Sequence, residues 1–188
     1  WDSLLTLTDQ ADAGTTRLVS SLSATQIEHL RTKIERHHRD WRRDWIEPGH
    51  AEVLDKRVKR TRERAEDFYG RLDARQQRLL RQQAERSPYD MAMSEALRLR
   101  RQEDIVSTLR TLQSQPLPPD EIRRQVRALL QRSVTSPVAS QQAYVDRVNN
   151  YNCRAMAQLH NSTSTEQRQS AFKRLQKYER DARALMAR

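Results

Sequence analysis

Glycine and proline are so scarce in this chain that the few places where they occur define its secondary structure. The sequence holds 3 glycines and 6 prolines in 188 residues, and both residue types interrupt helices. Such interruptions, or short polar stretches, fall at 47–49, 70, 87–88, 115–119, 135–137 and 161–163. The runs between them are rich in Gln, Arg, Ala, Leu and Glu, which favour helices. The sequence therefore predicts an all-α fold.

The spacing of apolar residues leads to the same prediction. In the segment 23–46, Ile27, Leu30 and Ile34 recur at steps of three and four residues, as on one face of a helix. The loop after this segment is short, so it is expected to form an antiparallel αα-hairpin with the segment 51–69. Other helices are expected at 73–86, 89–112, 119–133, 137–160 and 164–188, with a weaker helix at 1–21 that Gly14 interrupts; Phe172, Leu175, Ala182 and Leu185 are expected to form the core face of the last.

The expected architecture is an antiparallel helical bundle or elongated array of about seven or eight helices. We interpret residues 1–188 as a single all-helical domain, since that length suits one domain of ordinary size. The Pro-rich stretch 115–119 is the one place where a soft internal boundary would fall. It is also short enough to be a plain helix–helix connection.

Three of the expected helices begin with the same pattern, a capping residue followed three positions later by Gln. In this capping box the first side chain accepts a hydrogen bond from the backbone three residues on, and the Gln reaches back to the first backbone N–H. The pattern predicts helix starts strongly, but it occurs in any helical protein and indicates no function. The pairs are Ser23 with Gln26, Asp73 with Gln76, and Ser164 with Gln167.

The chain is strongly basic, with a net charge of +10 and 35 Lys and Arg residues. Such an excess favours anionic partners but says nothing of the fold, and a GC-rich genome would explain the abundance of Arg equally well. In the densest basic run, Arg57, Arg60 and Arg64 have no acidic partner four residues away and share a stripe that Arg98 and Arg101 on a later helix would extend. This stripe is the candidate binding site for phosphate- or sulfate-like groups. The alternative is a solvated face, which charge runs usually are.

No catalytic or cofactor motif is present in the sequence. The one cysteine, Cys153, has no neighbouring His to activate it, and there is neither a Gly-rich phosphate loop nor a Ser/His/Asp arrangement. We therefore expect no enzyme and no cofactor. Aromatics interleaved with the basic stripe, as expected for a nucleic-acid surface, are also missing. No run of 18 apolar residues occurs, so no membrane span is expected.

One cluster has residue types that bind metals. His37, His38, Asp40 and Asp44 lie within about two helical turns. Four arginines surround them, and His38 falls on the apolar face, so cations and packing both disfavour a divalent metal. We expect structural histidines and no metal site.

The three capping patterns, the stretches 41–46 and 68–72, and the ending 159–178 resemble a family of uncharacterised proteobacterial lipoproteins, known only as a domain of unknown function. The resemblance runs from about 18 to 185. Members usually begin with a lipobox cysteine and further residues absent from this sequence. The resemblance implies that the chain is the C-terminal part of a periplasmic protein with a lipid anchor in the outer membrane, and it implies no known catalytic residues.

The openings 22–26 and 72–76 are also similar, more loosely, to the L-T-x-x-Q pattern of the Spy/CpxP group of periplasmic helical proteins. That group includes chaperones that hold unfolded clients on a basic surface. The leading hypothesis is thus a non-enzymatic envelope protein whose basic surface binds an anionic envelope component or a partly unfolded client. The alternative is a structural or protein-interaction module with a specific protein partner. Nucleic-acid binding is the weakest hypothesis, supported by charge alone.

Overall fold

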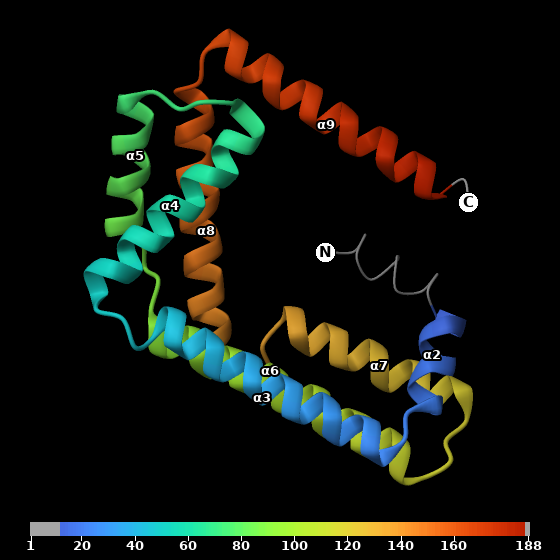
Figure 1. Cartoon of the computed structure of the whole chain (residues 1–188). Coiled ribbons are helices and arrows are strands. Elements are labelled where there is room, and N and C mark those ends of the chain that lie inside the picture. The colour runs from blue at the N-terminus through green and yellow to red at the C-terminus, as the bar shows by residue number, and fades with distance from the viewer. Residues whose placement is uncertain (1–11, 187–188) are drawn as a thin grey trace. The chain divides into compact units, whose positions relative to one another are not determined.

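The computed structural model of the chain describes residues 12–186, and within this range it contains eight helices and no strands (Figure 1). The predicted all-α fold is therefore confirmed. The helices are α2 (Asp12–Ser21), α3 (Ala24–Trp45), α4 (His50–Tyr69), α5 (Ala74–Glu85), α6 (Met91–Ser114), α7 (Pro119–Val134), α8 (Ala139–Asn161) and α9 (Thr165–Met186).

Local signals place the helix starts where the sequence predicts them. The Ser23 side chain accepts from the Gln26 N–H at 3.2 Å, and the Asp73 side chain accepts from the Gln76 N–H at 2.8 Å. Gly14 differs from expectation because it lies inside α2. One glycine costs a helix only about 1 kcal/mol relative to alanine, which is too little to end it. The rest of the expected first helix, 1–11, lies outside the described residues.

The chain divides into two compact units, with boundaries at 46/47, 89/90 and 145/146. The first unit holds α2, α3, α6, α7 and the start of α8, and the second holds α4, α5, the rest of α8 and α9. This differs from the expected single domain with a soft boundary at 115–119. That stretch connects α6 to α7, which pack together inside the first unit. Prolines end a helix, but whether two cores separate depends on how the flanking helices pack.

In the first unit, α3 packs against α6 and α6 against α7. Ile27 of α3 and Leu97 and Val106 of α6 are buried. Arg132 of α7 forms a bidentate ion pair with Asp104 of α6, with Nη2 2.8 Å from Oδ1 and Nε 2.9 Å from Oδ2. The expected αα-hairpin of 23–46 and 51–69 is wrong as a packing unit, because α3 pairs with α6 in one unit while α4 pairs with α5 and α9 in the other.

In the second unit, the core consists of Ala65, Leu72, Leu80 and Leu159, with Tyr69 packed against it. Beside this core two capping boxes meet. The side chain of Gln76 is only 2% exposed, and its Nε2 donates to the Ser162 carbonyl at 3.0 Å and to Gln167 Oε1 at 2.8 Å. The capping glutamines therefore do more than start α5 and α9: they also join these helices to the end of α8.

The last helix departs from expectation in its burial. No residue of α9 is buried, and Phe172, Leu175 and Leu185, expected to face the core, are exposed. The helix packs against α4, with an edge contact between the Phe68 and Tyr178 rings, yet its apolar stripe stays exposed. In the described range, no helix is both long enough and apolar enough to span a membrane.

Candidate anion-binding groove

The structure divides the predicted basic stripe between the two units. Arg57, Arg60 and Arg64 lie on α4, and Arg98 and Arg101 lie on α6. The prediction assumed that the two helices share one surface. Whether they do depends on tertiary packing, which sequence periodicity does not determine.

Three of these five arginines are engaged in packing within their own unit. The guanidinium of Arg57 lies 4.4 Å from the centre of the Tyr89 ring, and that of Arg98 lies 5.4 Å from the Trp41 ring. Burial, with a smaller contribution from the charge of Arg100, lowers the pKa of Arg101. Arg60 and Arg64 are exposed. This arrangement favours structural roles for Arg57, Arg98 and Arg101.

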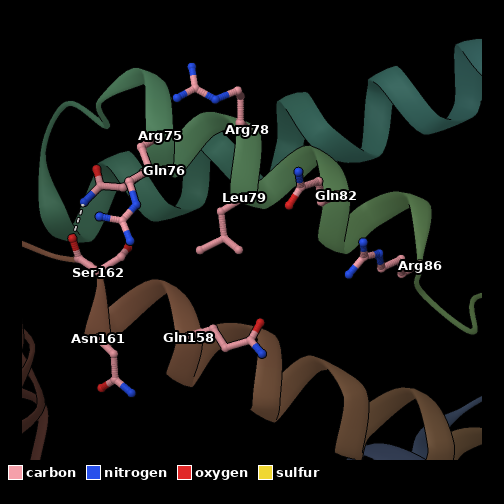
Figure 2. Close-up of a pocket in the computed structure, with 9 residues that line it drawn as sticks. All are labelled: Arg75, Gln76, Arg78, Leu79, Gln82, Arg86, Gln158, Asn161 and Ser162. Carbon is pink, nitrogen blue, oxygen red and sulfur yellow. Dashed lines mark hydrogen bonds between the residues drawn. The ribbon is translucent and has the colours of Figure 1, made fainter.

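A different set of arginines lines a groove between α5 and the end of α8 (Figure 2). The groove has a volume of about 610 Å³. Leu79 points from α5 into the space between the two helices, and Gln158 and Asn161 stand on the α8 wall. The lining residues are Arg75, Gln76, Arg78, Leu79, Gln82, Arg86, Gln158, Asn161 and Ser162.

The helical repeat of α5 places its groove-lining arginines on one side. Arg75, Arg78 and Arg86, with Gln82 between the last two, follow each other at steps of three and four residues, which is the spacing of one helix face. The buried side chains of Gln76 and Leu80 occupy a different face and hold α5 against the core. The bond from Gln76 to the Ser162 carbonyl, dashed in Figure 2, fixes one end of the groove by tying its two walls together.

Within the described part of the chain, no acidic side chain pairs with the arginines of this wall. Among the described residues, no hydrogen bond, ion pair or ring contact engages the side chains of Arg75, Arg78 or Arg86, and the lining contains no Asp or Glu. Arg81 on the same helix is a contrast, because its Nη2 lies 2.6 Å from Asp55 Oδ1. The groove thus presents three unpaired cations, while a neighbouring arginine is paired.

The lining determines what the groove is able to do. A guanidinium offers five donors in a planar fork that suits carboxylate, phosphate and sulfate groups, and it stays protonated at any physiological pH. Asn161 and Gln82 add amide donors. Ser162 Oγ is occupied, since it donates to the Leu159 carbonyl at 2.7 Å. The arrangement suits the binding of anions and offers no general base.

Sequence reasoning selected the densest basic run and missed this groove. The sequence signal that could have found the groove is the lack of acidic partners for its arginines, and not the density of basic residues. Neither Arg75 nor Arg78 has an acidic residue three or four positions away, so no ion pair within α5 was available to either. The second wall, at 158–162, comes from a helix distant in sequence and carries no local signal.

The histidine cluster is used in packing. His38 Nε2 lies 3.3 Å from Glu95 Oε1, and Arg42 pairs with the same carboxylate. Asp40 pairs with Arg43 at 2.9 Å. In the part of the chain that the structure describes, no group of three or more His, Cys, Asp or Glu side chains is arranged to hold a metal ion.

The fold and this groove define a class of protein: an all-helical protein with a basic, acid-free groove. The chain belongs to a family of unknown function, DUF6279, whose family model matches residues 2–134. The match includes the arginines of α5 and ends before the α8 wall. The resemblance to an uncharacterised family is thus shown over this shorter range. No curated protein and no solved structure matches the chain.

Proposed function

We propose that this protein is a non-enzymatic binding protein of the bacterial envelope, which holds an extended polyanion in the α5–α8 groove. The observation that carries the proposal is the set of three unpaired arginines, Arg75, Arg78 and Arg86, on an acid-free wall. The groove replaces the five-arginine stripe as the proposed site. The periplasmic location, and a lipid anchor on the full-length protein, rest on the resemblance to the lipoprotein family alone.

The length of the arginine row favours a ligand with several charges. Arg75 and Arg86 are 11 positions apart, or about 16 Å along a helix that rises 1.5 Å per residue. A single phosphate or sulfate reaches one or two guanidinium groups at most. A chain of such groups would engage the whole row, and release of its counterions would add to the affinity.

The composition of the groove favours an anion over the other two classes of partner. A client-binding surface of the Spy/CpxP kind needs apolar side chains beside its charge, and Leu79 is the one apolar residue among the nine that line the groove. Single-stranded nucleic acid is held largely by stacking on aromatic rings. None of the nine lining residues is aromatic.

A binding experiment with two charge-matched variants tests the proposal. Fluorescein-labelled heparin and poly-glutamate, as sulfated and carboxylated polyanions, are titrated with the full chain by fluorescence anisotropy. The variant Arg75→Gln/Arg78→Gln is expected to bind at least about tenfold more weakly, because two charge-assisted contacts are lost. The control Arg123→Gln/Arg124→Gln removes the same charge from two arginines of α7 that pair with Asp120 and Glu121.

The outcomes separate the hypotheses. Equal weakening by both variants would mean that net charge, and not the groove, attracts the polyanion. If wild type binds neither polyanion but suppresses aggregation of an unrelated unfolded protein, the chaperone-like hypothesis is favoured. If it does neither, the structural or protein-interaction hypothesis stands, and recovery of one specific partner protein would support it.

A further inference from the structure

The last helix has large apolar side chains that stay exposed in the part of the chain that the structure describes. Phe172 is 62% exposed, Leu175 56%, Leu185 72% and Met186 79%. Burying such side chains is favourable because it removes apolar surface from water, so leaving four of them exposed on one helix is costly. This concentration distinguishes α9 from the other described helices, where exposed large apolar residues are scattered.

Phe172, Leu175 and Met186 share one side of the helix, and Leu185 lies at the edge of that face. Positions 172, 175 and 186 follow at steps of three and eleven residues, which return to the same face at 3.6 residues per turn. The packing of α4 against α9 includes the edge contact between Phe68 and Tyr178, whose ring centres are 6.0 Å apart. Tyr178 remains 46% exposed. The apolar face is therefore wider than the part that α4 covers.

The rest of α9 is basic. Residues 172–186 include five cations and two acids. One of those acids, Glu179, is already paired with Arg183 at 2.8 Å, which leaves the basic excess facing solvent. The cations are Lys173, Arg174, Lys177, Arg180 and Arg183.

We propose that α9 binds flat on the surface of an anionic lipid bilayer, with Phe172, Leu175 and Met186 in the headgroup–acyl boundary. An exposed apolar face bearing Phe and Leu, opposite a face rich in Lys and Arg, is the pattern of interfacial helices. The long basic side chains at the edges of the face reach up to the lipid headgroups. A second copy of the chain fits less well, because pairing two α9 helices through this face would bring together the cations at its edges, such as Arg183 beside Phe172.

This surface is independent of the groove, since it uses another helix and another kind of ligand. Co-sedimentation of the full chain with vesicles tests it, comparing pure phosphatidylcholine with phosphatidylcholine containing phosphatidylglycerol. The chain is expected to bind the anionic vesicles far better. Phe172→Ser/Leu175→Ser is expected to lower binding by about tenfold or more, because two apolar side chains no longer enter the bilayer. Circular dichroism is expected to show unchanged helix content and melting, because neither residue is buried.

Matched variants make the test decisive. Leu99→Ser/Met156→Ser removes two exposed apolar side chains from other helices and is expected to leave vesicle binding intact. Arg75→Gln/Arg78→Gln is expected to leave most of it, so failure of the groove proposal is distinguishable from failure of this one. The inference is overturned if wild type does not bind anionic vesicles, or if Phe172→Ser/Leu175→Ser binds them as well as wild type. It is also overturned if sedimentation velocity shows a dimer that this variant abolishes, since a second copy would then occupy the face.

Discussion

At the scale of single residues, the identity of Gln76 is determined by two roles at once. Its Oε1 accepts from the Asp73 N–H at 3.0 Å, as a capping box requires, while its Nε2 donates to the Ser162 carbonyl and to Gln167. Glutamate satisfies the first role equally well. It has no N–H for the second, so a buried Gln76 implies a constraint that a capping box alone does not impose.

Replacing Gln76 by Glu is expected to lower the free energy of unfolding by about 2–3 kcal/mol, because two acceptors lose their donor and a charge is buried. Urea denaturation followed by circular dichroism measures this. Gln26→Glu is the control, since Gln26 holds the same position in an exposed capping box and is expected to change stability by less than about 0.5 kcal/mol. Equal effects at both positions would contradict the role of the Gln76 amide.

At the scale of helices, α9 is held to its unit by contacts that extend as far as Tyr178. Thr163, just before α9, is 4% exposed, and Gln167 Nε2 donates to the Arg71 carbonyl at 3.0 Å. Beyond Tyr178 every described residue is exposed. Stability would thus depend on the part of α9 up to Tyr178, whereas the proposed membrane contact uses exposed side chains along the whole helix.

Deleting residues 179–188 is accordingly expected to leave the melting temperature within a few degrees of wild type, since it removes no buried side chain. Deleting 162–188 is expected to cause a much larger loss, because Gln76 then loses both of its acceptors and Thr163 is removed. Differential scanning calorimetry of the two truncations provides the comparison. A large loss from the shorter deletion would show that the exposed part of α9 is needed for folding.

At the scale of the whole molecule, local signals predicted the helices but not their partners. The starts of α3, α5 and α9 depend on a few neighbouring residues, so Ser23, Asp73 and Ser164 were enough to locate them. Pairing of α3 with α6 depends on which apolar faces are buried together across about 60 residues of sequence, which periodicity does not encode. The groove was missed for the same reason. The sequence shows that Arg75 and Arg78 have no acidic partner within α5, but Asn161 and Ser162 become a second wall only through packing.

The division into two units has a consequence for stability across the molecule. Leu159 is 1% exposed in the core of the second unit, and Leu159→Ala is expected to cost about 2–5 kcal/mol. Hydrogen exchange is expected to show lost protection in α4 and α5, with α3 and α6 little changed, because local unfolding follows cooperative units. Uniform loss in all four helices would mean that the chain unfolds as one unit.

The central claim is that specific arginines of the groove contact a polyanion, and the salt dependence of binding tests it most directly. The slope of log affinity against log salt concentration reports the number of cations that displace counterions. For heparin binding, Arg75→Gln/Arg78→Gln is expected to reduce the magnitude of this slope by about two relative to wild type. Arg123→Gln/Arg124→Gln is expected to leave it unchanged. Parallel lines for wild type and Arg75→Gln/Arg78→Gln would contradict the claim, because the two arginines would then make no contact with the bound polyanion.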